Sequence, residues 1–111
     1  MKELSARDLA AMGTAAGAPV PLLLDVREPW EFEHAAIRID GLETRLMPMN
    51  SIPARIDELD PLQPVVCICH HGARSAQVVA FLERQGFEAV YNLAGGVDAW
   101  SQQVDPRVPR Y

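Results

Sequence analysis

Short, continuous apolar runs recur along the chain, with polar and helix-like stretches between them. The runs lie at residues 22–24, 46–47, 65–68 and 89–91. Continuous rather than alternating apolar residues are typical of strands that are buried on both faces of a parallel sheet. We therefore predict a buried β-strand at each of these positions.

Helical patterns fill the stretches between the strands. Ser5 and Asp8 form a variant of the capping box, and Pro29 suits the first turn of a helix. Apolar residues within 78–82 form a stripe, and Gly86 follows at a position that ends many helices. Helices are predicted over residues 5–12, 29–34, 75–85 and 97–103, and a further one from a cap at Asn50 or Ser51 to residue 59. This alternation predicts an α/β fold, a mostly parallel sheet with helices on both faces.

The size and charge of the chain restrict its functional class. A length of 111 residues predicts a single domain over residues 1–111. The formal net charge of −5 argues against nucleic acids and anionic membranes as partners. No apolar run approaches the ~18 residues of a membrane-spanning helix, and residues 1–5 lack the apolar core of a secretory signal. We therefore expect a cytoplasmic protein without a membrane partner.

The chain contains two cysteines, Cys67 and Cys69, two positions apart at the predicted strand 65–68. A disulfide between them would be strained, and their spacing is not that of a metal-binding pair. We therefore expect no metal and no cofactor. Cys67 lies within the apolar run and is interpreted as a small buried core residue.

Cys69 opens the run Cys69, His70, His71, Gly72, Ala73, Arg74 and Ser75, which lies between a predicted strand and a predicted helix. A glycine-containing turn before a helix directs backbone N–H groups toward an anion, and the helix start adds partial positive charge. The same field favours a thiolate, which is the nucleophilic form of cysteine. Arg74 adds a cation suited to binding an oxyanion through two N–H donors.

Three segments resemble the rhodanese family of sulfurtransferases. Residues 69–75 are similar to its active-site loop, residues 24–32 (LDVREPWEF) to its first signature, and residues 93–100 (LAGGVDAW) to its C-terminal signature. The resemblance implies a small rhodanese-like domain with a five-stranded, mainly parallel sheet. The chain departs from the family after the first signature, where residues 33–41 replace the usual Gly-His-Ile and Gly-Ala segments.

The resemblance also implies roles for individual residues. Cys69 matches the cysteine that accepts sulfur, and residues 70–74 match the loop whose amides surround that sulfur. Asp25 and Arg27 match a supporting pair of the first signature. From the residues alone, this pair is equally well a structural ion pair, and Ser75 either donates its hydroxyl toward Cys69 or caps the following helix.

The chemistry expected is sulfur transfer in two steps. The Cys69 thiolate takes the outer sulfur of thiosulfate or of a small persulfide, and a thiol or a protein acceptor then removes it from the Cys69 persulfide. A phosphatase or arsenate reductase is one alternative, but those enzymes have one residue more between cysteine and arginine than the four found here. A non-catalytic binding module on the same fold is the other alternative.

Overall fold

The structure is a computed structural model that describes residues 2–12 and 19–111. The elements, with η for a 3₁₀-helix, run in the order β1 (Lys2–Leu4), α1 (Ala6–Met12), β2 (Leu22–Asp25), α2 (Pro29–His34), β3 (Thr44–Leu46), η1 (Met49–Ser51), α3 (Ile52–Arg55), η2 (Ile56–Glu58), β4 (Val65–Ile68), α4 (Ala73–Arg84), β5 (Val90–Leu93) and α5 (Gly96–Gln103). The predicted α/β alternation is confirmed. Gly17, Ala18 and Pro19 predict a loop, and residues 17 and 18 of it lie outside the described residues.

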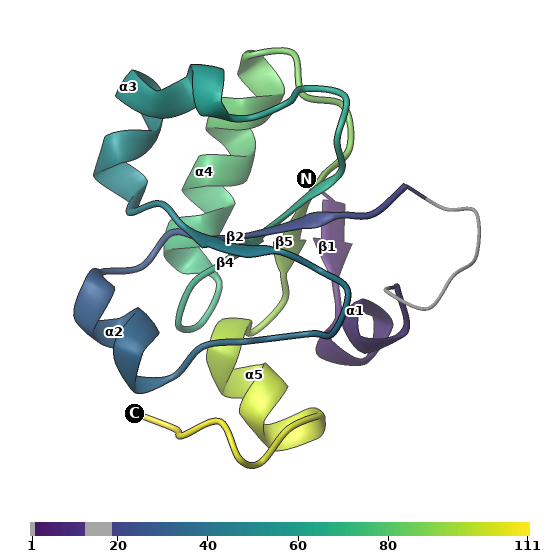
Figure 1. Cartoon of the computed structure of the whole chain (residues 1–111), viewed down its shortest axis with the longest axis vertical. Helices are drawn as coiled ribbons and strands as arrows, with labels where there is room; N and C mark the ends of the chain where they lie inside the picture. The colour runs from purple at the N-terminus through teal and green to yellow at the C-terminus, as the bar shows by residue number, and fades with distance from the viewer. Residues whose placement is uncertain (1, 13–18) are drawn as a thin grey trace.

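The five strands form one sheet in the order β1-β5-β4-β2-β3, and every pair of neighbouring strands is parallel. Helices cover both faces, with α3 and α4 on one side and α1 and α5 on the other (Figure 1). All residues of β2 and β4 are buried, because each strand has helices above and below it. The expectation of a parallel sheet covered on both faces is therefore confirmed.

Some boundaries differ from the sequence-based expectation. The strand β1 was not predicted, because it is short, carries two charged residues and shows no apolar run. The third strand lies at 44–46 rather than at 46–47, and α4 begins at Ala73, two residues before the predicted start. The predicted helix ending at residue 59 is three short pieces, η1, α3 and η2, with Pro53 in the first turn of α3.

The carboxyl ends of the strands meet at one edge of the sheet. Asp25 ends β2 and pairs in register with Ile68, the residue immediately before Cys69, and Asn92 lies beside Cys67 in the neighbouring strand β5. In parallel sheets, binding sites form at this edge. The fold therefore brings Asp25, Cys69 and Asn92 from three separate segments to one location.

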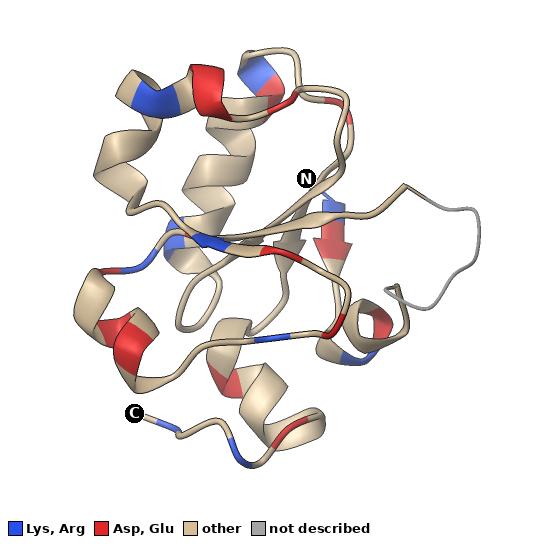
Figure 2. Ribbon diagram, viewed as in Figure 1, with Lys and Arg blue, Asp and Glu red and all other residues tan. Residues whose placement is uncertain are grey.

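Charged residues of both signs are interspersed over the outer helices and the C-terminal segment (Figure 2). Exposed ion pairs such as Arg55–Glu58 and Arg107–Asp105 join neighbouring residues. Within the described residues, no helix combines the length and apolar character required to cross a bilayer.

Candidate active site

The sulfur of Cys69 lies within hydrogen-bond distance of one donor in the turn that follows it and of one donor in the first turn of α4. The backbone N–H of Gly72 lies 3.0 Å from Sγ, and the hydroxyl oxygen of Ser75 lies 3.2 Å from it. Gly72 immediately precedes α4 and has a φ of +108°, a conformation that favours glycine. The loop therefore folds back over the sulfur at the amino end of a twelve-residue helix, where partial positive charge stabilises an anion.

Cys69 is only 1% exposed, so its sulfur lies at the bottom of the loop rather than on the surface. Cys67 is fully buried in the core two residues earlier, and burial, followed by the nearby Cys69, raises the pKa of its thiol well above the usual range. A thiol in that environment stays protonated and unreactive. The two cysteines are thus chemically distinct, as the sequence predicts for Cys67.

Ser75 is buried inside the first turns of α4 and joins Cys69 to Asn92. Its hydroxyl oxygen lies 2.5 Å from Oδ1 of Asn92 as well as 3.2 Å from the sulfur. A hydroxyl has one hydrogen, so it cannot donate to both groups at once. The thiol can donate to Ser75 while Ser75 donates to Asn92, and a thiolate can instead receive the Ser75 hydrogen.

The orientation of Asn92 is fixed by two further acceptors. Its amide nitrogen donates to the carbonyl of Gly72 at 3.1 Å and lies 3.4 Å from a carboxylate oxygen of Glu3. Because both partners are oxygen acceptors, the amide nitrogen must face them and Oδ1 must face Ser75. Asn92 therefore fixes the turn at Gly72 and the hydroxyl of Ser75 in position relative to each other.

The amino end of α5 binds the opposite side of the same loop. The N–H groups of Val97 and Asp98 donate to the carbonyls of Cys69 and His70 at 2.9 and 3.1 Å. Since the carbonyl and N–H of a trans peptide point in opposite directions, the N–H groups of His70 and His71 point away from α5. Gly96 permits this close approach, because any Cβ there would collide with the two loop carbonyls.

Arg74 is held by Glu31, which lies on α2. Its two terminal nitrogens, Nη1 and Nη2, donate to the two carboxylate oxygens of Glu31 at 2.7 and 2.8 Å. The hydrogen bond from Arg74, together with bonds from Tyr111 and the backbone of Glu28, lowers the pKa of Glu31 to about 2. Arg74 thus ties the first turn of α4, directly after the Cys69 loop, to α2 through its two outer nitrogens.

Asp25 and Arg27 form a buried ion pair at the carboxyl end of β2, the strand that pairs with β4. Oδ2 of Asp25 lies 2.6 Å from Nη2 of Arg27, and both side chains are at most 1% exposed. Burial by itself would lower the pKa of Arg27, but the hydrogen bond and charge of Asp25 and the contact with Tyr111 raise it. Arg27 also donates to the carbonyl of Ala35 and so fixes the chain after α2.

Tyr111 connects these groups from the C-terminal segment. Its hydroxyl accepts a hydrogen bond from Arg27 and donates one to Glu31, both at 2.7 Å. Its ring stacks on His70, with the ring centres 3.9 Å apart and the planes 5° from parallel. A continuous polar network therefore runs from Asp25 through Arg27, Tyr111 and Glu31 to Arg74.

The two histidines stack on each other, with ring centres 4.0 Å apart. Burial, followed by repulsion from His71, lowers the pKa of His70, so its ring is neutral at neutral pH. His71 is largely exposed, and its Nδ1 lies 4.0 Å from the carboxylate of Asp98. Ala73 is exposed and opens α4.

The structure brings the sequence-derived site residues together around one loop, and it adds four that were not assigned a role. Asn92 follows the predicted strand 89–91, and its place at a strand end, where sites gather in parallel sheets, is evident from the sequence. Gly96 lies within the C-terminal signature, and that position alone could have drawn attention to it. Glu31 falls inside the first signature. Tyr111 has no sequence pattern that places it here, because its contacts reach across more than 75 residues.

Comparison with known proteins identifies the family to which the chain is similar. The family model of the rhodanese-like domain matches residues 5–103. A sulfurtransferase of Allochromatium vinosum is 41% identical over 87 residues, which cover 78% of each protein. The chloroplast rhodanese-like/PpiC domain-containing protein 12 of Arabidopsis thaliana is 39% identical over 93 residues, and this match covers 80% of the chain but spans 30% of that protein's length.

Solved structures extend the agreement to the fold. The rhodanese-like domain protein from Staphylococcus aureus superposes with a TM-score of 0.75 at 30% identity, over 90% of this chain and 91% of that one. A rhodanese-related protein from Thermoplasma volcanium gives 0.76 at 27% identity, over 94% of both chains. With the family match covering nearly the whole described chain, the protein belongs to the rhodanese-like domain family.

Proposed function

We propose that the protein is a catalytically active sulfurtransferase that carries sulfur as a persulfide on Cys69. The observation that carries this proposal is the environment of Cys69 Sγ, which has a loop N–H at 3.0 Å and a hydroxyl at 3.2 Å beside the start of α4. The similarity to a named sulfurtransferase supports it. A single domain over residues 1–111 is part of the same proposal.

The reaction is a pair of nucleophilic displacements with no net oxidation. In the first, the Cys69 thiolate attacks the outer sulfur of thiosulfate, the S–S bond of thiosulfate breaks, and sulfite leaves with the bonding electron pair. In the second, an acceptor attacks the outer sulfur of the persulfide, and Cys69 leaves as a thiolate. With cyanide as the acceptor, the product is thiocyanate.

The loop assists by stabilising negative sulfur. The Gly72 N–H reaches the sulfur directly, and the N–H groups of His70 and His71 point away from α5, as an anion-binding turn requires. Donors of this kind act as an oxyanion hole does, and removing one donor from such a site typically costs ~3–4 kcal/mol. Because Cys69 is 1% exposed, the donor must present its terminal sulfur end-on.

The main role that we propose for Arg74 is to position the loop, not to bind the donor directly. Both of its terminal nitrogens are bonded to Glu31, so its guanidinium positions the loop and adds positive charge nearby. Donation from Arg74 to the sulfite oxygens stays a prediction, and it would require the donor to compete with the Glu31 carboxylate.

The decisive experiment is intact-mass analysis after treatment with thiosulfate. We expect a gain of about 32 Da, one sulfur atom, located on the Cys69 peptide and removed by cyanide with release of thiocyanate. Cys69→Ala should abolish the adduct while the far-UV circular dichroism stays native. Cys67→Ala, the matched control, should keep it. Absence of the adduct in the wild-type protein, or its presence in Cys69→Ala, would refute the proposal and favour a non-catalytic binding module.

A further inference from the structure

Arg74 is the arginine that follows the Cys69 loop, and its charge acts on the reactive sulfur. It directly precedes Ser75, whose hydroxyl oxygen lies 3.2 Å from Sγ of Cys69. The hydrogen bond with Glu31 is the largest cause that raises the pKa of Arg74, and the charge of Cys69 acts in the same direction. The guanidinium is therefore within electrostatic reach of the sulfur and of a donor that docks on it.

The charge of Arg74 is matched by a carboxylate that is itself held in place. Both terminal nitrogens donate to Glu31, at 2.7 and 2.8 Å, and the Glu31 side chain is only 5% exposed. One Glu31 oxygen also accepts the N–H of Glu28, and the other accepts the hydroxyl of Tyr111. With its pKa lowered to about 2, mainly by the hydrogen bond from Arg74, Glu31 is ionised at neutral pH. The pair therefore carries no net charge.

Two other arginines near the loop are matched in the same way. Arg27 pairs with Asp25 at 2.6 Å, and both side chains are buried. Arg110 pairs with Asp98 at 2.9 Å, and the same carboxylate lies 4.0 Å from Nδ1 of His71. Each of these guanidiniums has a carboxylate of its own, so these ion pairs bring no excess positive charge to the loop.

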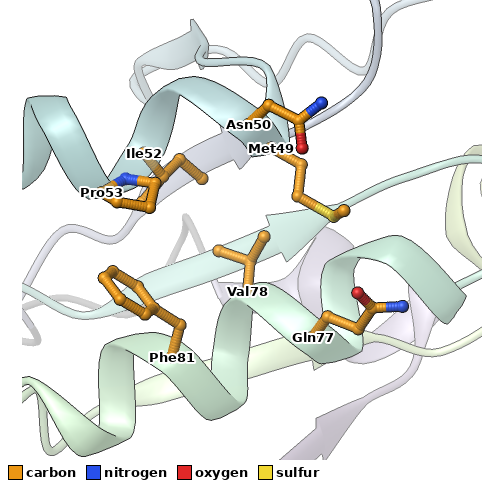
Figure 3. Close-up of a pocket in the computed structure, with 7 residues that line it drawn as sticks. All are labelled: Met49, Asn50, Ile52, Pro53, Gln77, Val78 and Phe81. Carbon is orange, nitrogen blue, oxygen red and sulfur yellow. The ribbon is translucent and has the colours of Figure 1, made fainter.

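The groove between α3 and α4 supplies no substitute cation (Figure 3). The described residues that line it are apolar or carry carboxamides, as Asn50 and Gln77 do, and none of them is charged. The groups that stabilise an anion at Cys69 are the N–H of Gly72 and the start of α4. A helix start acts as roughly half a positive charge, which suits one negative charge on sulfur.

Sulfur donors differ in the charge that they carry beside the outer sulfur. Thiosulfate has two negative charges, shared between its outer sulfur and its sulfonate oxygens, whereas the anion of an organic persulfide has one, on the outer sulfur. To reach Arg74, the sulfonate must displace Glu31, and this nearly buried carboxylate would then lose its partner of opposite charge. The arrangement therefore favours the donor with a single charge.

We infer that the sulfur donor of this site is an organic persulfide rather than thiosulfate, and that Glu31 determines this preference by occupying Arg74. Thiosulfate still loads Cys69, but a higher concentration is required. Glu31 acts through Arg74 and is therefore a positioning residue. The inference rests on the proposed function, because it names the donor for the first displacement of that reaction.

The atoms of this displacement balance for either donor. The Cys69 thiolate attacks the outer sulfur, the sulfur–sulfur bond of the donor breaks, and the remainder leaves with the bonding electron pair. The leaving group is a thiolate from an organic persulfide and sulfite from thiosulfate. The outer sulfur is transferred without an added oxidant or reductant.

The test compares two donors that differ by one charge. In methanethiosulfonate, a methyl group replaces one charged oxygen of thiosulfate, so this probe keeps the outer sulfur and has a single negative charge. Each donor is mixed with the protein at a series of concentrations, and formation of the Cys69 persulfide is followed by intact mass. The concentration dependence gives a maximal rate and a half-saturating concentration for each donor.

Glu31→Gln leaves Arg74 with an unmatched positive charge, while the side-chain amide oxygen can still accept the N–H of Glu28. The half-saturating concentration of thiosulfate should fall about tenfold, because the sulfonate then meets a free cation. The maximal rate should change less than about threefold, since this contact is made before the sulfur–sulfur bond breaks. For methanethiosulfonate, both values should stay within about twofold. A change in the thiolate itself would affect the two donors alike.

Two further variants trace the gain to Arg74. Glu33→Gln removes the same charge from an exposed position on α2 and should leave both donors within about twofold of wild type. Arg74→Gln combined with Glu31→Gln should abolish the gain for thiosulfate. A gain that survives in this double variant would overturn the inference. So would an unchanged half-saturating concentration in Glu31→Gln, and persulfide formation in both proteins would then leave the proposed function standing.

The wild-type protein gives a test that does not depend on the folding of a variant. Raising the ionic strength from about 0.02 to about 0.5 M screens charges near the site. The formal net charge of −5 repels the doubly charged donor more strongly. The rate with thiosulfate relative to methanethiosulfonate should therefore stay constant or rise. A severalfold fall in this ratio would show an unmatched cation at the site and contradict the inference.

A binding measurement keeps the inference testable if no persulfide forms. Thiosulfate is titrated by calorimetry into Cys69→Ser and into Cys69→Ser combined with Glu31→Gln, with native far-UV circular dichroism required of both. The protein with the Glu31→Gln change should bind thiosulfate about tenfold more tightly. Absence of tighter binding would reject the role of Glu31 regardless of the outcome of the activity assay.

Discussion

Arg74, in the first turn of α4, and Glu31 of α2 form a bidentate ion pair with distances of 2.7 and 2.8 Å. Glu31 also closes the capping box of α2, since one of its carboxylate oxygens accepts the N–H of Glu28 at 3.1 Å. The same carboxylate accepts the hydroxyl of Tyr111. One side chain therefore connects the loop, a helix start and the C-terminal segment.

Glu31→Gln should weaken the fold in a manner that depends on pH. The Arg74 hydrogen bond and the other contacts lower the pKa of Glu31 from 4.5 to about 2. A lowered pKa stabilises the folded state above pH 4.5, and this contribution disappears as the pH falls through 2. We expect a loss of about 1–3 kcal/mol at pH 7, below the full value of the shift because Arg74 is partly exposed.

The measurement is urea unfolding of both proteins at pH 7 and at the lowest pH at which both remain folded. The stability difference should shrink toward low pH. Glu33→Gln, an exposed glutamate on the same helix, is the control and should change stability little. A difference that is the same at both pH values would show that the Glu31 charge is not the cause.

Ser75→Ala should slow persulfide formation from thiosulfate by roughly ten- to a hundredfold. The hydroxyl is 3.2 Å from the sulfur, and a hydrogen bond to a charged group is worth about 1.5–3 kcal/mol. The rate is measured by stopping the reaction at successive times and determining the fraction of protein that carries a persulfide by intact mass. The control is Ser101→Ala, which removes a buried hydroxyl bonded to the carbonyl of Val108. Equal rates for wild type and Ser75→Ala would exclude a role for this hydroxyl in stabilising the thiolate.

Gly96→Ala should destabilise the protein and impair the loop. Its φ is +60°, and the added Cβ would collide with the carbonyls of Cys69 and His70. We expect a loss above about 2 kcal/mol, because the collision adds to the ~1 kcal/mol or more of a left-handed alanine. Gly86 also has a positive φ, +95°, but nothing lies within 4 Å of an added Cβ. Gly86→Ala therefore measures the cost of the backbone conformation without a collision.

Thermal unfolding and the rate of persulfide formation should be measured on both glycine variants. Only Gly96→Ala should lose activity while still folded, because only that residue holds α5 against the loop. If both variants lose the same stability and neither loses activity, the packing of α5 on the loop carbonyls is not required for function.

Tyr111→Phe should cost about 1–2 kcal/mol, because the buried Arg27 loses an acceptor while the stacking on His70 remains. Burial, with the hydrogen bond to Glu31, raises the pKa of Tyr111 to about 12. The stability contributed by the neutral phenol is therefore complete below pH 10 and is lost as the pH rises through 12. Urea unfolding measures the loss of stability in Tyr111→Phe, and the phenolate absorbance as a function of pH measures the pKa of Tyr111 in the wild-type protein. Tyr91→Phe is the control, and a Tyr111 phenol that titrates at pH 10 would contradict the buried network.

The local pattern of the sequence was sufficient for the parts of the fold that depend on neighbours in the chain. The continuous apolar runs at 22–24 and 65–68 correctly predicted two central strands, because a strand buried on both faces has apolar residues at successive positions. The apolar stripe within 78–82 correctly predicted α4, because a helix buried on one side has apolar residues at helical spacing. The strand β1 shows no such sequence pattern, since an exposed edge strand of three residues needs only backbone pairing with β5.

The sequence by itself determined that a cysteine follows a buried strand and precedes a glycine turn and a helix, and this local pattern is the basis on which Cys69 is proposed as the nucleophile. Only the tertiary structure decided which groups surround that loop: Asn92 and Ser75 on the sulfur side, α5 on its carbonyls, and Glu31 with Tyr111 on Arg74. The physical reason is the distance along the chain between the residues that interact. Backbone conformation and strand burial follow from adjacent residues, whereas ion pairs and stacked rings form between segments that meet only when the sheet is assembled.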